Sequence, residues 1–317
     1  MCRILAYLGE EIPLENLLLK PENSLINQSR APKLHPLMQL AGWGFGVWSD
    51  SFECPERPLI YRRHSPAFFD DNAQTMIPSL RAHTALAHVR AATYRAETVL
   101  ADENCHPFFF QGEPWIMVHN GSVPEIRLLQ RDLVTHCQPE FLKQIKGTTD
   151  SEFFFCLLLS LLNGNYSTDN FQWALEEALK LIILSLKRQN VEKPVKLKLA
   201  LASAHDLVAV NYGCGFSGQT ELQGDWRELR KEPVGSPNFL LSTILEPLYL
   251  LQGRNFHHYE HSYDMHCGED VEVDTVILAS EPLTANTDDW LEVPFLNLVR
   301  ITTGDNCMTR EIRQLNL

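Results

Sequence analysis

The first ten residues, MCRILAYLGE (Met1–Glu10), decide how the rest of the chain is interpreted. The apolar run CRILAYL at Cys2–Leu8 predicts a short buried strand that begins at a thiol. Removal of the initiator methionine would leave Cys2 as the first residue, with a free α-amine beside its thiol. A terminal amine, with a pKa of about 7.7–8.0, is deprotonated in roughly a tenth of molecules at neutral pH and can serve as base for such a nucleophile. The alternative is a buried structural thiol, because free cysteine is among the most buried residue types.

The composition limits the classes of function. The 317 residues are 44% hydrophobic and 21% charged, as in globular proteins, and 27 Lys+Arg against 40 Asp+Glu give a net charge of −13. Without a basic run, neither nucleic acid nor an anionic membrane is an expected partner. The longest apolar stretch, 153–162, is about half of a membrane span, and acidic residues come too early for a signal peptide. We therefore expect a soluble, cytoplasmic protein in which most of the eight scattered cysteines are reduced, buried thiols.

Apolar runs bounded by turn residues predict the elements of the fold. The predicted strands are 2–8, 42–48, 59–64, 84–93, 115–120, a pair around a tight turn within 195–212, 274–280, 295–301 and 308–317. The predicted helices are short segments within 13–20, 73–82 and 123–133 and long ones at 148–162 and 171–188. This order favours an α+β fold with grouped strands and outer helices. No linker divides the chain, so 1–317 is expected to form one domain, with 213–238 as a surface excursion.

One polar cluster ends the predicted strand before residue 121. His119-Asn120-Gly121 suits a tight turn, for which Asn-Gly is the commonest dipeptide. It also suits an oxyanion hole, in which the Asn120 amide and the Gly121 backbone N–H bind the oxygen of a tetrahedral intermediate. Both interpretations remain open at this point.

Three further polar residues complete a chemical set. Arg90 and Thr93 end the strand TALAHV and could hold a substrate carboxylate, or they could be ordinary strand-end residues. Asp150 begins the helix at 148–162, either as a favourable first-turn charge or as the partner of a substrate ammonium. Together with Cys2 and the possible oxyanion hole, these residues describe a site for a γ-glutamyl group.

These motifs resemble the class II glutamine amidotransferases, the N-terminal-nucleophile family. The resemblance rests on MCR at 1–3, GWGFG at 42–46, HVRAAT at 88–93, HNG at 119–121 and TDSE at 149–152. INQS at 26–29, ENCHPF at 103–108 and LASEPLT at 278–284 with DW at 289–290 resemble the stand-alone branch. That branch includes the amidotransferase-like subunit of the fungal glutathione-degrading complex and the γ-glutamyl hydrolase of ergothioneine synthesis.

The resemblance implies a four-layer αββα sandwich of two stacked antiparallel sheets. It implies that Cys2 is the nucleophile, that Asn120 and Gly121 form the oxyanion hole, and that His119 shapes this hole. Arg90 and Thr93 would hold the α-carboxylate and Asp150 the α-amine. The implied reaction is hydrolysis of a γ-glutamyl amide such as glutamine or glutathione through a γ-glutamyl thioester, with neither cofactor nor metal.

Other classes of function remain as alternatives. The chain could be a glutaminase subunit that passes ammonia to a separate synthetase, or a non-catalytic subunit that binds γ-glutamyl groups. HHYEHSYDMHC at 257–267 contains four histidines, which could suggest a metal site. The segment lacks helical periodicity, so we expect a polar strand pair or a wall of the substrate pocket instead.

Overall fold

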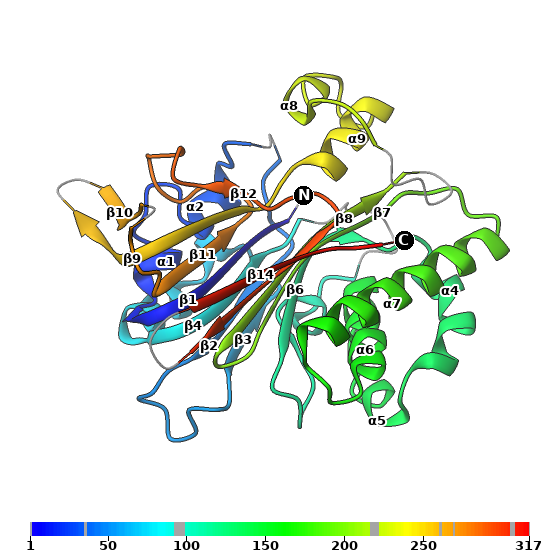
Figure 1. Ribbon diagram of the computed structural model, residues 1–317, viewed down its shortest axis with the longest axis horizontal. Helices are drawn as coiled ribbons and strands as arrows, with labels where there is room; N and C mark the ends of the chain where they lie inside the picture. Colours follow the sequence, from blue (N-terminus) through cyan, green and yellow to red (C-terminus); the bar gives the residue numbers. More distant parts are fainter. Residues whose placement is uncertain are drawn as a thin grey trace.

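The fold of the protein rests on two antiparallel sheets (Figure 1). The computed structural model describes residues 2–34, 37–91, 99–215, 222–259, 262–268, 270–304 and 308–316. The first sheet has the order β10-β9-β11-β1-β4-β2-β3, with β12 paired to β9, and the second has the order β14-β13-β8-β7-β6-β5. Strands of the first sheet are β1 (Arg3–Pro13), β2 (Trp43–Trp48), β3 (Leu59–Arg63), β4 (Arg81–Val89), β9 (Tyr249–Tyr259), β10 (Ser262–His266), β11 (Thr275–Ala279) and β12 (Leu291–Glu292). Strands of the second are β5 (Phe108–Phe109), β6 (Ile116–Ser122), β7 (Val195–Ala202), β8 (Asp206–Cys214), β13 (Asn297–Thr303) and β14 (Met308–Gln314).

Helices cover the outer face of each sheet, which gives four layers (Figure 1). The helices are α1 (Glu15–Leu18), α2 (Leu25–Arg30), α3 (Asp71–Met76), α4 (Ile126–Leu133), α5 (Pro139–Leu142), α6 (Asp150–Leu162), α7 (Thr168–Arg188), α8 (Trp226–Leu229) and α9 (Pro237–Leu245). Helices α1 to α3 share a core with the first sheet, and α4 to α7 share one with the second. The predicted αββα sandwich is confirmed. None of the helices in the described part of the chain has both the length and the apolar character needed to cross a membrane.

Strand β1 lies in the middle of the first sheet and is buried on both faces. Ile4, Ala6 and Leu8 face the second sheet, while Leu5 and Tyr7 pack in the core beneath the outer helices. β1 pairs antiparallel with β11 on one side and with β4 on the other, where Arg3 is opposite Val89. Because alternate residues of a strand point to opposite faces, Cys2 shares the face of Ile4 and points toward the second sheet.

The long helices begin as their capping residues predict. Thr149 caps α6, with its hydroxyl accepting a hydrogen bond of 3.2 Å from the Glu152 backbone N–H. Nearly every residue of α6 is buried, because it lies between the second sheet and its neighbour α7. This packing fixes the N-terminal turn of α6, and therefore Asp150, at one end of the sandwich.

Several sequence predictions need correction or refinement. The turn expected after His119-Asn120 does not form, because β6 continues in register with β7 through Gly121 and Ser122. The helix expected at 73–82 is shorter in the structure, because α3 ends at Met76. The last two residues of the predicted range, 81 and 82, belong to β4. Of the late strands, β11 belongs to the first sheet, and β13 and β14 belong to the second. The histidine-rich stretch forms the strand pair β9–β10, as expected, with Ser262 opposite Tyr259.

The stretch predicted as a surface excursion lies partly outside the described residues. Its first two residues belong to the end of β8, and its described later part carries α8. The following helix α9 contacts β8, so the segment is attached to the second sheet (Figure 1).

Close approach between the two sheets explains the glycines of β2. A Cβ at Gly44 would lie 2.4 Å from the carbonyl oxygens of both His106 and Tyr61. A Cβ at Gly46 would instead meet the ends of the Ile116 and Ile60 side chains. The first obstacle is backbone and cannot move locally, whereas the second can rotate away.

Two buried histidines lie in this contact between the sheets. His88 on β4 and His106 before β5 have ring centroids 4.1 Å apart, and none of their ring nitrogens has a hydrogen-bond partner in the described structure. Burial is the main cause that lowers the pKa of His88 to about 3 and that of His106 well below its usual value. Both rings are therefore neutral at physiological pH.

We predict that Gly44→Ala lowers the free energy of unfolding by about 1–3 kcal/mol, because the new methyl group overlaps backbone oxygens. The matched variant Gly46→Ala should cost less, since only side-chain ends must move. Chemical denaturation of both variants tests this, and equal stabilities would contradict the explanation.

The histidine pair also predicts a pH dependence of stability. In the unfolded chain a histidine binds a proton below about pH 6.5, whereas His88 in the folded protein does so only near pH 3. As the pH falls, the unfolded state therefore binds a proton before the folded state does. The free energy of unfolding should fall by up to about 1.4 kcal/mol per pH unit below pH 6.5. His88→Phe should show a shallower fall from pH 6.5 to 5 but an unchanged slope from pH 7 to 8.5. If His88→Phe and the wild type had the same slope of stability against pH in both windows, His88 would not contribute to the pH dependence.

Candidate active site

A pocket of about 550 Å³ opens at the end of the sandwich where β1 begins and β4 ends. Its lining includes five of the residues singled out in the sequence, namely Cys2, Arg90, His119, Gly121 and Asp150. They come from the start of β1, the end of β4, the end of β6 and the start of α6. Antiparallel pairing of β1 with β4 explains the first two, because the start of one strand lies beside the end of the other.

The Cys2 thiol is held against the backbone of Ala91. The Ala91 N–H donates a hydrogen bond of 3.3 Å to Cys2 Sγ, and Sγ lies 3.6 Å from the Ala91 carbonyl oxygen. The side chain remains partly exposed to the pocket. Neither contact is with a group that could take its proton, so these described contacts provide no side-chain base.

His119 lies beneath the pocket with both ring nitrogens engaged. Nε2 is 3.0 Å from the Lys196 carbonyl oxygen, and Nδ1 is 2.9 Å from Ser151 Oγ. A carbonyl can only accept, so Nε2 carries the proton and Nδ1 accepts from the serine hydroxyl. Burial lowers the pKa of His119 despite the nearby Asp150 carboxylate, which keeps the ring neutral. Both ring nitrogens are thus engaged by neighbouring groups.

Glycine is required at position 121 because of this ring. A Cβ there would lie 2.0 Å from the Lys196 carbonyl oxygen and 2.2 Å from His119 Nε2. The close packing places the Gly121 backbone at the pocket wall. A strand that continues to Ser122, rather than a turn, therefore carries this part of the candidate oxyanion hole.

Asn120 lies beside the pocket but is not one of its lining residues. It is 2% exposed and is opposite Lys198 in the register of β6 with β7. By strand alternation its side chain shares the face of Val118, which packs between the two sheets, and Cys2 points into this same layer. Asn120 and Cys2 thus lie in one layer, on facing sheets.

Asp150 and Arg90 give the pocket two opposite charges. Asp150 Oδ2 accepts a hydrogen bond of 2.7 Å from the Val123 N–H, and Oδ1 accepts one of 2.9 Å from the Ser151 N–H. Arg90 donates from Nη1 to the Val99 carbonyl oxygen at 3.4 Å, and its backbone N–H bonds to Gly42. Such a pair is suited to a zwitterionic α-amino acid group. Thr93, the predicted second carboxylate ligand, lies outside the described residues.

Two lysines behind the pocket, Lys198 buried and Lys196 half-buried, were missed in the sequence. Lys196 and Lys198 alternate with leucines in VKLKLALA, a pattern that usually indicates solvent-facing lysines. Here the first sheet covers that face. Burial lowers the pKa of Lys196 to about 8 and that of Lys198 to about 7, while Glu246, 3.7 Å from the Lys198 ammonium, opposes both shifts. Lys196 also interacts electrostatically with Cys2.

Cys105, by contrast, has no role as a nucleophile. It is fully buried, its thiol lies 3.3 Å from the Arg63 carbonyl oxygen, and burial raises its pKa to about 11. It therefore stays protonated at neutral pH, as expected for a structural thiol.

Comparisons with known proteins identify the family of the chain. The family model for class II glutamine amidotransferases matches residues 35–211. The probable glutamine amidotransferase DUG3 of Saccharomyces cerevisiae is 26% identical over 334 residues, covering 95% of this chain and 82% of that protein. The gamma-glutamyl-hercynylcysteine sulfoxide hydrolase of Mycobacterium tuberculosis is 34% identical over 125 residues, which are 39% of this chain and 50% of that one.

Solved structures share the fold. A glutamine aminotransferase class-II domain protein from Silicibacter pomeroyi aligns over 99% of this chain and 100% of its own, with a TM-score of 0.57 and 20% identity. The glutamine phosphoribosylpyrophosphate amidotransferase of B. subtilis aligns over all of this chain and 50% of its own, with a TM-score of 0.50 and 15% identity. These likenesses support the two-sheet architecture alone. Because the family model spans more than half of the sequence, the chain belongs to the class II glutamine amidotransferases.

Proposed function

We propose that the protein is a γ-glutamyl amide hydrolase whose nucleophile is the Cys2 thiol. The observation that carries this proposal is that one pocket holds the thiol, a cation and an anion, namely Cys2, Arg90 and Asp150. Arg90 would bind the α-carboxylate of the glutamyl group, together with Thr93, and Asp150 would bind the α-ammonium. The pocket would then direct the γ-carbonyl toward Sγ.

The proposed reaction needs Met1 to be removed, because only then is the Cys2 nitrogen an amine. The amine accepts the thiol proton while Sγ attacks the γ-carbonyl carbon. The resulting oxyanion is stabilised by the Asn120 amide and the Gly121 N–H. The ammonium returns the proton to the leaving nitrogen, the C–N bond breaks, and a γ-glutamyl thioester remains. Water, deprotonated by the same amine, then attacks the thioester and releases glutamate and the free thiol.

Two features of the site support this division of roles. His119 has both nitrogens engaged, so it can hold the hole in place but cannot compete as base. The described contacts of Sγ are with the Ala91 backbone, which leaves the direction toward the pocket open for a substrate. The names of the yeast and mycobacterial relatives are consistent with a glutamyl substrate.

We predict that Cys2→Ala abolishes glutamate release, by at least about 10³-fold in kcat, because the thioester cannot form. Release is measured from glutamine, glutathione and other γ-glutamyl amides by coupled detection of glutamate. Cys54→Ala, which alters an exposed thiol, is the control and should behave as wild type. Glutamine as the only good substrate would favour the glutaminase-subunit alternative. Binding without any turnover in the wild type would favour the non-catalytic alternative and contradict the hydrolase.

Recognition of the α-amine by Asp150 gives a second prediction. The wild type should prefer glutamine over glutaric acid monoamide, which lacks only the α-amine, and Asp150→Asn should reduce this preference in kcat/KM by about 10–100-fold. The single asparagine oxygen can accept from only one of the Val123 and Ser151 N–H groups, so the change removes the charge and one hydrogen bond. Loss of that hydrogen bond affects both substrates alike, whereas loss of the charge affects only the substrate with an α-amine. Asp132→Asn, which alters an exposed carboxylate bonded to Ser185, is the control. If Asp150→Asn weakened both substrates equally, the assigned contact would be wrong.

A further inference from the structure

We propose that the buried ion pair between Arg3 and Glu281 is a positioning device for the Cys2 nucleophile, an inference that rests on the proposed function. Both residues belong to motifs that the site described above does not use, MCR at 1–3 and LASEPLT at 278–284. Arg3 is completely buried and Glu281 is 1% exposed.

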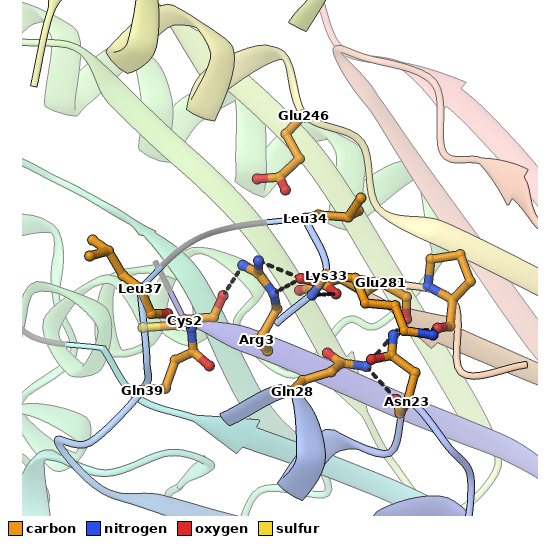
Figure 2. Close-up of polar contacts among 12 residues, drawn as sticks. Cys2, Arg3, Asn23, Gln28, Lys33, Leu34, Leu37, Gln39, Glu246 and Glu281 are labelled. Atoms are coloured by element: carbon orange, nitrogen blue, oxygen red, sulfur yellow. Dashed lines mark hydrogen bonds and ion pairs between the residues drawn. The ribbon is translucent and has the colours of Figure 1, made fainter. Parts of the chain in front are cut away.

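The Arg3 guanidinium binds Glu281 and Cys2 at the same time (Figure 2). Nε donates to Glu281 Oε1 at 2.7 Å, and Nη2 lies 2.5 Å from the same oxygen. Nη1 donates to the Cys2 carbonyl oxygen at 3.1 Å. The planar guanidinium therefore links a carboxylate to the backbone of the nucleophile in a fixed direction.

Glu281 is itself held firmly. Its second oxygen accepts a hydrogen bond of 2.8 Å from the Lys33 N–H (Figure 2). It follows Ser280, whose N–H bonds to the Ile4 carbonyl oxygen and whose hydroxyl accepts from the Ile4 N–H at 3.0 Å. Glu281 therefore directly follows a residue that is hydrogen-bonded to β1 at Ile4, and Ile4 is two residues after Cys2.

A terminal nucleophile requires such a contact. Once Met1 is removed, no preceding residue restrains Cys2, and chain ends fray unless they are tied down. The thiol is held by Ala91 and the carbonyl by Arg3, which are two points on opposite sides of the Cys2 Cα. Fixing both points fixes the direction of the third substituent, the amine that serves as base.

Stability alone does not explain the ion pair. Removing two charges from water has a large cost, and apolar residues of similar size often stabilise a protein equally well or better. A buried pair that also contacts the nucleophile can have a second effect, which is to hold the nucleophile in position. Position matters because a displacement of about 1 Å at a reacting group can lower the rate by about 10²-fold.

The test compares two variants with a matched control. Arg3→Lys keeps the charge, but one ammonium nitrogen cannot occupy the positions of both Nε and Nη1. Arg3→Met/Glu281→Met removes both charges and fills the space with side chains of similar length. The control is Arg300→Lys, because Arg300 likewise binds a carboxylate, Asp206, and a carbonyl, that of Tyr166. Asp206 is at the start of β8, at the other end of the second sheet from Asn120.

We expect kcat for glutamate release to fall about 10–100-fold in both Arg3 variants, with KM changed less than about 3-fold. Arg300→Lys should keep the wild-type kcat. The decisive comparison is between the double variant and the wild type. The two proteins should have the same unfolding midpoint, while the kcat of the double variant is low. If kcat recovered together with stability, the pair would be structural only and the proposal would be overturned. Intact mass must show equal removal of Met1 in all proteins.

A readout without activity separates this inference from the proposed function. If the wild type releases no glutamate, the hydrolase proposal fails, and hydrogen–deuterium exchange then tests the positioning alone. Amides of the N-terminal peptide 2–8 should exchange faster in both Arg3 variants than in wild type and in Arg300→Lys. Unchanged exchange in that peptide would overturn the inference.

Discussion

The burial of β1 on both faces is the constraint on which the rest of the structure depends. A strand between β11 and β4, with one sheet in front of it and helices behind it, cannot shift by one residue without reversing every side chain. Its register therefore fixes Cys2 at the edge of the layer between the sheets. Because β4 and β6 end at the same edge, Arg90, His119 and Gly121 reach one pocket without any long loop supplying them. The site is a consequence of strand pairing.

The layer between the sheets changes character along β1. Around Ile4 and Leu8 it is apolar, with alanines of β7 and β8 facing them. Toward Cys2 it contains buried polar and charged groups, among them Asn120, Lys198 and Glu246. Glu246 contacts Lys198 and also lies 3.2 Å from Arg230, which follows α8. The carboxylate therefore connects the segment of α8 and α9 to the sheet that carries the candidate oxyanion hole, and charge at this end of the layer is compensated locally.

Much of the fold was predictable because local patterns and tertiary structure agree. The apolar runs at β1, β2 and β6 and the turn between β7 and β8 all predicted the observed elements. What failed depended on partners far away in sequence. The Asn120-Gly121 dipeptide is typical of a turn, but pairing with β7 extends the strand. Lys196 and Lys198 look solvent-facing until the first sheet covers them, and Glu281 gives no sign that it contacts Arg3, 278 residues away. The candidate site residues at strand ends were found because a nucleophile, a cation and an anion together match one substrate group. The supporting residues Lys196, Lys198 and Glu281 match no substrate group and were missed.

The titratable groups around the pocket bear on the proposed choice of base. Burial keeps His88 and His106 uncharged, and His119 has no free nitrogen. Cys105 is protonated, and the described contacts of Sγ are with Ala91 alone. Lys196 interacts electrostatically with Cys2, and burial lowers the pKa of this lysine to about 8. The proposed base is the α-amine of Cys2 itself, which exists only after Met1 has been removed. In this proposal, processing of the first residue supplies the base, and the contact between Arg3 and the Cys2 carbonyl sets its direction.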